Sequence, residues 1–599
     1  MIAPSPSDQG AGGMQQPTTA NGRSQVCSTS WVSKLRRLWF SLQVSHSGSK
    51  YSIERLLALE EYTRHTSLAR VLLVCFGTPT PMVVLVMLQE CVPLQDPSDG
   101  WSANYGFWIR TGVLGGVVAV GMAAFALYMI PGVVLSNLQL VFLFVGQAIC
   151  YPFVAMLVAS LWVFPIPFMV LTIISLYVML FAVLFRIIAG KEVFSQMGKH
   201  QDEIILLVSF SSSQSVMAVS YAAYQILFDH VTSTHFELPI ILLLPVIKLI
   251  MKNLVSRCIV HMKDMVPEAV IFTVDFFNSL YLATCMQNTS SITTIVAMMA
   301  LDFTQTAVAL RCLHRRTNTI VSRLNQAGGA LGNANGLLPS VSLLCSNTDK
   351  FEQQNRDSIV IDSCLPHKLS SDGRALLDKL RTIPGNGIRS LPRFSSLEIS
   401  SIFRLSVDKA ALTGKIKPMW KCRHRSLTRI RPSSTTMNAK HVRSATKVSS
   451  KSLDTAVSPH QKILGETLEV LFTSECLILT EYLESVIPVL YGQFILLVVN
   501  LPSAKYHMDL IGVTRENVGD TLRGVYLYAL LEFASFVTLT VMMMRNCRLQ
   551  ALYHLAFVLE TQMLLVQVKL MTWVLMTLSF RVVHFGAYFS RVFVPSLFF

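Results

Sequence analysis

Long apolar segments separated by short polar loops fill almost the whole chain. A helix needs about 20 apolar residues to cross a hydrocarbon layer of about 30 Å, because no water is available there to its backbone polar groups. About eleven segments meet this requirement. They lie at residues 71–89, 110–130, 138–163, 166–189, 204–228, 238–258, 267–287, 292–312, 485–501, 523–544 and 558–585. The pattern predicts an all-α fold, a polytopic transmembrane helical bundle with eight segments before a long polar interruption and three after it.

Two local features refine this pattern. The third and fourth segments form one apolar run, which we divide at Pro165 and Pro167 because proline has no N–H and moves the residue before it out of the helical region. The second segment carries Gly115, Ala119 and Ala123 at a spacing of four residues. Small residues at that spacing lie on one face of a helix and predict close packing against a neighbouring helix.

The sequence divides into five predicted parts. Two transmembrane blocks, 71–312 and 463–599, flank a basic loop at 313–462, which is predicted to be disordered because Ser, Thr, Gly and Asn are frequent in it. Residues 1–50 are predicted to be a disordered N-terminal tail. Residues 51–70 alternate apolar and charged side chains, which predicts an amphipathic helix at the membrane interface.

Composition and charge agree with a membrane protein. Hydrophobic residues make up 52% of the chain and charged residues only 14%, whereas soluble domains have about 25% charged residues. The 313–462 loop holds 25 Lys and Arg against 9 Asp and Glu, a net of +16, while the whole chain carries +15. Such a loop is typical of the cytoplasmic side and attracts anionic lipid headgroups. We therefore expect the lipid bilayer as the partner, with headgroup contacts through residues 415–451, in preference to nucleic acid.

The distribution of basic loops predicts the orientation of the chain. Placing the N-terminus in the cytoplasm puts the loops that carry Arg70, Lys191, Lys252 and Arg257 on the cytoplasmic side, together with the 313–462 loop. The remaining disagreement is Arg591, which eleven crossings would place outside. The last segment is therefore predicted to be re-entrant or to lie partly along the membrane surface.

Three ionisable residues fall inside consecutive predicted membrane helices: Lys248, Asp275 and Asp302. Each lies about nine residues from the predicted cytoplasmic boundary, so a rise of about 1.5 Å per residue places all three in one layer roughly 13 Å deep. An ionisable residue at such a depth is costly and is a functional candidate. Lys248 can neutralise one of the acids and leave the other to bind a cation or a proton. The alternative is a buried ion pair beside one protonated Asp, with no transport role.

A second group of polar residues accompanies this layer. Glu532 and Lys569 lie inside the last two predicted segments, where they are secondary buried charges and candidate partners of each other. Ser211, Gln214 and Ser215 belong to a Ser-rich cluster in the fifth segment. That cluster predicts either the wall of a hydrated cavity or close helix packing.

Motifs of enzymes are absent from the sequence. It contains no HExxH, no GxSxG, no P-loop and no Gly-rich nucleotide fingerprint, and its Cys and His lack the spacing of metal ligands. We therefore predict no catalytic activity, no cofactor and no metal site. The predicted function is that of a transporter or channel-like protein built on the charge layer. The alternative is a receptor or scaffold that acts through its basic cytoplasmic loop.

Several short stretches resemble a family of oomycete (Phytophthora-type) multi-pass membrane proteins. They are YSIERLLALEEY at 51–62, GTP at 77–79, NYGFW at 104–108, LEFASF at 531–536 and RVVHFG at 581–586. The resemblance covers both membrane blocks but not the basic loop. It implies a lineage and a multi-pass fold, and it supplies neither an activity nor site residues.

Overall fold

The computed structural model describes residues 51–130, 133–231, 237–259, 265–289, 292–326, 338, 345, 360–382 and 459–586. The predicted tail at 1–50 and most of the predicted basic loop, including residues 415–451, lie outside this part of the chain. Within it, the fold is helical, and the one β-type pairing is a single antiparallel bridge between His507 and Val582.

Ten helical stretches of the described chain are long and apolar enough to cross a membrane. In chain order their helices are α3–α4 (Leu68–Gly77, Thr80–Glu90), α5 (Tyr105–Met129), α6 (Asn137–Leu161), α8 (Ile174–Met197), α9 (Gln201–Val231), α10–α11 (Glu237–Ile241, Leu243–Cys258), α12–η4–α13 (Val266–Val270, Ile271–Asp275, Phe276–Asn288), α14 (Ile292–Gln326), α18 (Val518–Cys547) and α20 (Met563–Arg581). These helices confirm the predicted class, an all-α polytopic transmembrane bundle.

The second block differs in detail from the prediction. The predicted segment 485–501 is not among the ten stretches; most of its residues form the C-terminal part of a much longer helix, α17 (Pro459–Val498), which has 40 residues. The predicted segment 558–585 spans two helices, α19 (Ala551–Thr561) and α20, with non-helical backbone at Gln562 between them.

Both local predictions in the first block are confirmed. The chain leaves the helical conformation between α6 and α8, where only the short α7 (Met169–Thr172) follows Pro165 and Pro167. On α5, Ala119 and Ala123 are fully buried. A Cβ atom placed on Gly115 would lie 2.8 Å from the ring of Tyr151 on α6, so only glycine permits this approach of the two helices.

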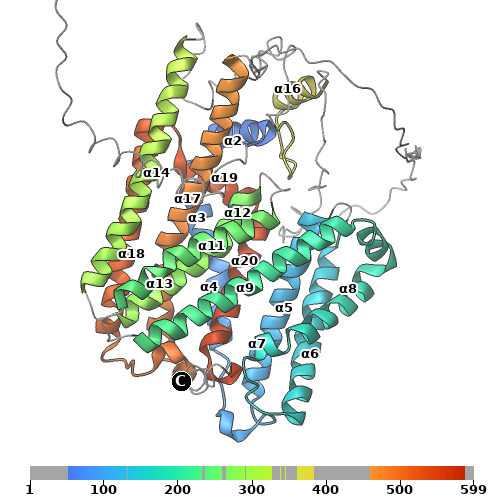
Figure 1. Ribbon diagram of the computed structural model, residues 1–599. Helices are drawn as coiled ribbons and strands as arrows, with labels where there is room; N and C mark the ends of the chain where they lie inside the picture. The colour runs from blue at the N-terminus through green and yellow to red at the C-terminus, as the bar shows by residue number, and fades with distance from the viewer. Residues whose placement is uncertain are drawn as a thin grey trace, which may run out of the picture.

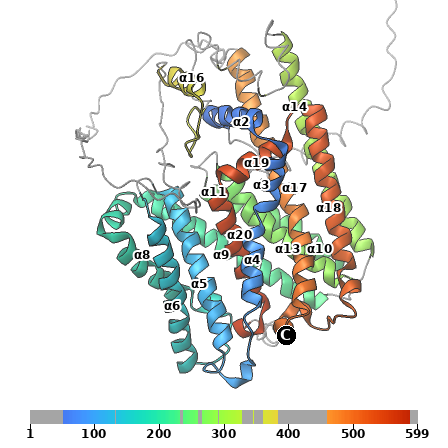
Figure 2. The same cartoon turned by 180° about the vertical axis from the view of Figure 1, so that it is seen from behind.

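The helices are arranged in two groups joined by oblique helices. Helices α5, α6 and α8 stand together on one side, and α14, α17 and α18 stand together on the other (Figures 1 and 2). Helix α9 runs obliquely between the groups and contacts both α5 and α13 (Figure 1). Helix α20 packs against both α5 and α4, near the middle of the bundle.

The predicted amphipathic helix at 51–70 is divided in the structure: helix α2 (Ile53–His65) ends before α3, and its first half is covered by protein. Its first seven residues, Ile53 to Leu59, are all buried, Glu54 and Arg55 included. Residues 360–369 cover it: the N–H of Ile53 donates to the carbonyl of Val360 at 3.0 Å, and the N–H of Ser363 donates to the carboxylate of Glu54 at 3.0 Å. The carboxylate of Glu54 therefore has its hydrogen-bond donors within the protein.

Part of the predicted disordered loop is therefore ordered. Helix α14 continues to Gln326, and residues 360–382 form a segment that ends in helix α16 (Ser371–Thr382). We name residues 360–382 the docked segment. Together with α2 it lies at one end of the bundle, and the end of the described chain lies at the other (Figure 1).

Candidate functional site

The structure brings the three predicted residues of the charge layer into one region of the bundle. Lys248 lies on α11, Asp275 at the end of the π turn η4, and Asp302 on α14. The Nζ atom of Lys248 lies 3.2 Å from Oδ1 of Asp275. Asp302 takes part in no ion pair with the residues that the structure describes, although its charge interacts with that of Lys248.

Two further acids on α17, Glu481 and Glu484, lie in the same region and were not among the predicted site residues. Carboxylate oxygens of Asp302, Glu481 and Glu484 lie within 4.8 Å of one another. Glu484 also forms an ion pair with Lys248, and Glu481 accepts hydrogen bonds from the hydroxyls of Thr306 at 2.5 Å and Ser535 at 3.0 Å. Converging carboxylates of this kind repel one another unless a cation or protons lie between them.

A fourth carboxylate, that of Glu532 on α18, faces the same three acids. Glu532 is 4% exposed, and its charge interacts with those of Asp302, Glu484 and Glu481. Its Oε2 atom has no hydrogen-bond partner among the described residues. We name Asp302, Glu481, Glu484 and Glu532 the acid cluster.

Lys569, the predicted partner of Glu532, lies elsewhere. It is buried on α20, where its ammonium donates to the carbonyl of Ala269 at 3.1 Å and lies 4.8 Å from the ring centre of Phe125. The predicted pair is therefore wrong, because α18 and α20 turn these two side chains toward different neighbours.

Acids outnumber bases in this region. Lys252, which the sequence assigned to a cytoplasmic loop, is buried on α11 and lies 3.0 Å from Oδ2 of Asp275. The region thus holds five carboxylates and two ammonium groups: Asp275, Asp302, Glu481, Glu484 and Glu532 face Lys248 and Lys252. With every group ionised the net charge would be −3, which a buried site of low dielectric sustains only with bound cations or protons.

Local backbone features position these side chains. The turn η4 is π-helical and ends at Asp275. A π turn adds one residue to the helical turn and so rotates the side chains that follow it, and such turns are frequent at functional sites. On α17, Pro488 lies inside the helix. Because proline has no N–H, the carbonyl of Glu484 loses its usual donor four residues later, so the hydrogen-bond pattern of α17 is interrupted beside this acid.

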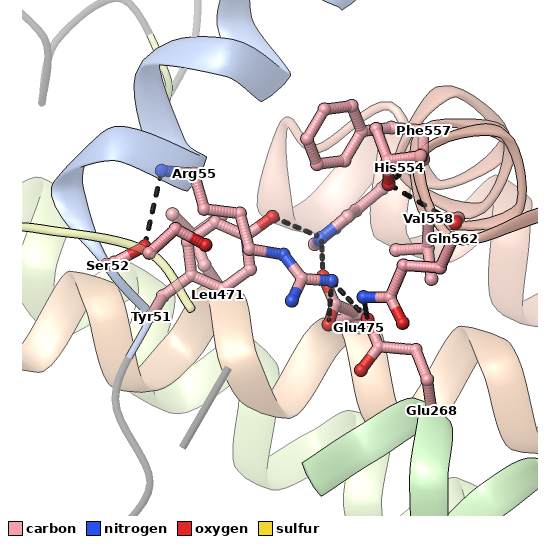
Figure 3. A network of polar contacts seen from close by, with 12 residues as sticks. Tyr51, Ser52, Arg55, Glu268, Leu471, Glu475, His554, Phe557, Val558 and Gln562 are labelled. Carbon is pink, nitrogen blue, oxygen red and sulfur yellow. Dashed lines mark hydrogen bonds and ion pairs between the residues drawn. The ribbon is translucent and has the colours of Figure 1, made fainter. Parts of the chain in front are cut away.

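A separate polar network lies nearer the docked segment (Figure 3). The guanidinium of Arg55 forms ion pairs with Glu268 on α12 and, at 2.9 Å, with Glu475 on α17. Glu475 also contacts Nε2 of His554 on α19 at 2.9 Å, and Gln562 donates to Glu268 at 2.6 Å. This network ties α2 to three helices that are distant in sequence.

The bundle also contains a cavity of about 450 Å³ away from the acid cluster. Its wall includes Arg581, which is paired with Asp509 and donates to Thr284 at 2.9 Å. None of the acid cluster lines this cavity. Its charges are already balanced, so it has less capacity for a charged ligand than the acid cluster has.

The comparisons with known proteins add no family. No model of a protein family, no curated protein and no solved structure matches the chain. The fold and the site therefore define its class by themselves: an all-α multi-pass membrane protein with an acid-rich polar centre between α11, α14, α17 and α18.

Proposed function

We propose that this protein is a membrane transporter that binds a hard cation at the acid cluster. The observation that carries the proposal is the convergence of Asp302, Glu481 and Glu484 within 4.8 Å, beside the unpartnered oxygen of Glu532. Oxygen donors of this kind are the ligands of Mg²⁺, Ca²⁺ and Mn²⁺.

Lys248 connects the acid cluster to α11. Glu484 belongs to the cluster and also pairs with Lys248, which in turn pairs with Asp275. A cation that binds Glu484 competes with Lys248 for the same carboxylate. Its entry therefore weakens the contact between α11 and α17, and its release restores that contact. Such a ligand-dependent ion pair between two helices would couple cation binding to helix movement, as alternating access needs.

Cation binding is tested on the purified full chain in detergent. Thermal unfolding is measured with Mg²⁺, Ca²⁺ or Mn²⁺ and with choline as the control cation. We expect at least one divalent cation to raise the melting temperature in a saturable way, because a ligand that binds only the folded state stabilises it. The gain should be lost in Glu481→Gln and retained in Glu469→Gln, a matched change on the same helix at a carboxylate that pairs with Arg316 near the surface. Equal stabilisation of both variants would contradict the proposed site.

Transport is tested separately, in vesicles that contain the purified protein and an entrapped fluorescent indicator for divalent cations. We expect cation entry that depends on Glu481 but not on Glu469. If the cation stabilises the protein but no entry occurs, the binding site stands and the transport function is refuted.

A further inference from the structure

A smaller cavity of about 160 Å³ lies between α5, α8, α9 and α20, and no residue of the acid cluster lines it. Most of its wall is apolar or aromatic, with Tyr151 and Tyr177 on one side. Its rim includes Ile174 and Val178, which are 37% and 45% exposed on the outer surface of the bundle. In a membrane that outer surface faces lipid, so a ligand can reach the cavity from the hydrocarbon layer.

Lys569 lines this cavity and has no acidic ion-pair partner among the described residues. It is 3% exposed, and its contacts are the carbonyl of Ala269 and the faces of Phe125 and Phe210. Glu268 interacts with its charge but is held by Arg55 and Gln562. A buried ammonium is costly unless an anion accompanies it.

Three further groups on the cavity wall lack partners. The Nε2 atom of Gln214, the hydroxyl of Thr572 and the Nε1 atom of Trp573 are buried and have no hydrogen-bond partner among the described residues. Each of them can donate a hydrogen bond. Ser211 and Ser215 lie on the same wall. A wall that combines a buried ammonium with unused donors, and that contains no carboxylate, favours a ligand rich in hydrogen-bond acceptors and negatively charged.

We propose that this cavity binds the carboxylate of a single-chain amphiphile, such as a fatty acid, from the lipid layer. The volume of the cavity favours a ligand with one acyl chain over a ligand with two. A dry cavity of about 150 Å³ holds a molecule the size of benzene. The cavity therefore takes a carboxylate and the first few carbons, while the rest of the chain passes the apolar rim. One ammonium balances one carboxylate, whereas a phospholipid would bring a larger headgroup and two chains. The inference does not depend on the proposed transport function.

The test uses the full chain in detergent and brominated stearate, whose bromine atoms quench tryptophan fluorescence. Trp573 reports on the cavity, and its signal is the difference between the parent protein and Trp573→Phe. We expect saturable quenching of that signal by brominated stearate. We also expect Lys569→Met to weaken binding about 10- to 100-fold, the factor that a hydrogen bond between charged groups contributes. Lys569→Met removes a buried charge and should fold, which its melting temperature checks.

Three controls show whether binding depends on the carboxylate, on Lys569 and on a ligand with a single acyl chain. Brominated stearyl alcohol has the same chain without the charge, and we expect it to bind about as weakly to the parent protein as stearate binds to Lys569→Met. Lys505→Met, at an exposed lysine outside the spans, should leave stearate binding unchanged. Equal quenching by the acid and the alcohol, or unchanged binding in Lys569→Met, would overturn the proposal. Quenching by a brominated anionic phospholipid that depends on Lys569 to the same extent would overturn the assignment to a single-chain ligand.

Discussion

Replacing Arg55 by Met should destabilise the protein more than any change of an exposed arginine. Arg55 is 2% exposed and forms ion pairs with Glu268 and Glu475, which are also almost fully buried. Without Arg55, two carboxylates remain in the interior with no cation between them. Removing one partner of a buried ion pair costs about 3–5 kcal/mol, because the remaining charge is left uncompensated. We expect a loss of this size in the free energy of unfolding.

The matched control is Arg64→Met on the same helix. Arg64 pairs with Glu60 four residues earlier and is 68% exposed, and exposed pairs of this type contribute about 0.3–0.5 kcal/mol. The assay is reversible denaturant unfolding in detergent, followed by circular dichroism. Adding Glu268→Gln to Arg55→Met should recover part of the loss, because an amide keeps the hydrogen bond from Gln562 and removes one of the two charges. If Arg55→Met costs no more than Arg64→Met, the network does not hold α2 in place.

Three further predictions follow from named contacts. Burial lowers the pKa of His367 in the docked segment to about 3. Docking is therefore stable above the free pKa of about 6.5 and weakens as the pH falls toward 3, by up to about 2 kcal/mol at pH 5. The protection factors of the amides of residues 360–382, which are exchange rates corrected for their intrinsic pH dependence, should fall between pH 7 and pH 5 in the parent chain but not in His367→Gln. Lys248→Met and Glu484→Gln should be non-additive by about 0.5–3 kcal/mol in unfolding experiments, and strict additivity would show that the two side chains do not interact. Gly115→Ala should lower the free energy of unfolding by about 1–3 kcal/mol, because the added methyl group contacts Tyr151. Gly465→Ala on α17 has open space around it and should raise the free energy of unfolding by up to about 1 kcal/mol. The same sign for both changes would contradict the packing of α5 on α6.

The sequence predicted the helical class and most of the helices because membrane spans depend on local hydrophobicity. It also predicted Lys248, Asp275 and Asp302 as one group, since their depth follows from the helical rise. It did not predict that α17 begins far before residue 485, and so it missed Glu481 and Glu484. The signal was present, because these two acids are spaced three residues apart at the edge of an apolar run. The positive-inside rule likewise predicted that Lys252 lies in a cytoplasmic loop. In the structure it is buried and pairs with Asp275 on a neighbouring helix.

The pairing of Glu532 with Lys569 could not be judged from the sequence. Both residues lie in apolar helices and carry opposite charges, which is all that local reasoning can use. Which face each helix turns to its neighbours depends on packing between distant segments. The buried state of α2 has the same origin, since the docked segment that covers it is more than 300 residues away along the chain.

The length of α17 lets it connect parts of the molecule that lie far apart. Its 40 residues extend about 60 Å, roughly twice the thickness of the hydrocarbon layer. Along it lie Glu466 and Glu469, which pair with arginines of α14, then Glu475 in the Arg55 network, and then Glu481 and Glu484. About 27 Å separates the first of these acids from the last. Over this length, a tilt of a few degrees about the C-terminal end of α17 would displace its N-terminal end, where Glu466 and Glu469 pair with α14, by several ångströms.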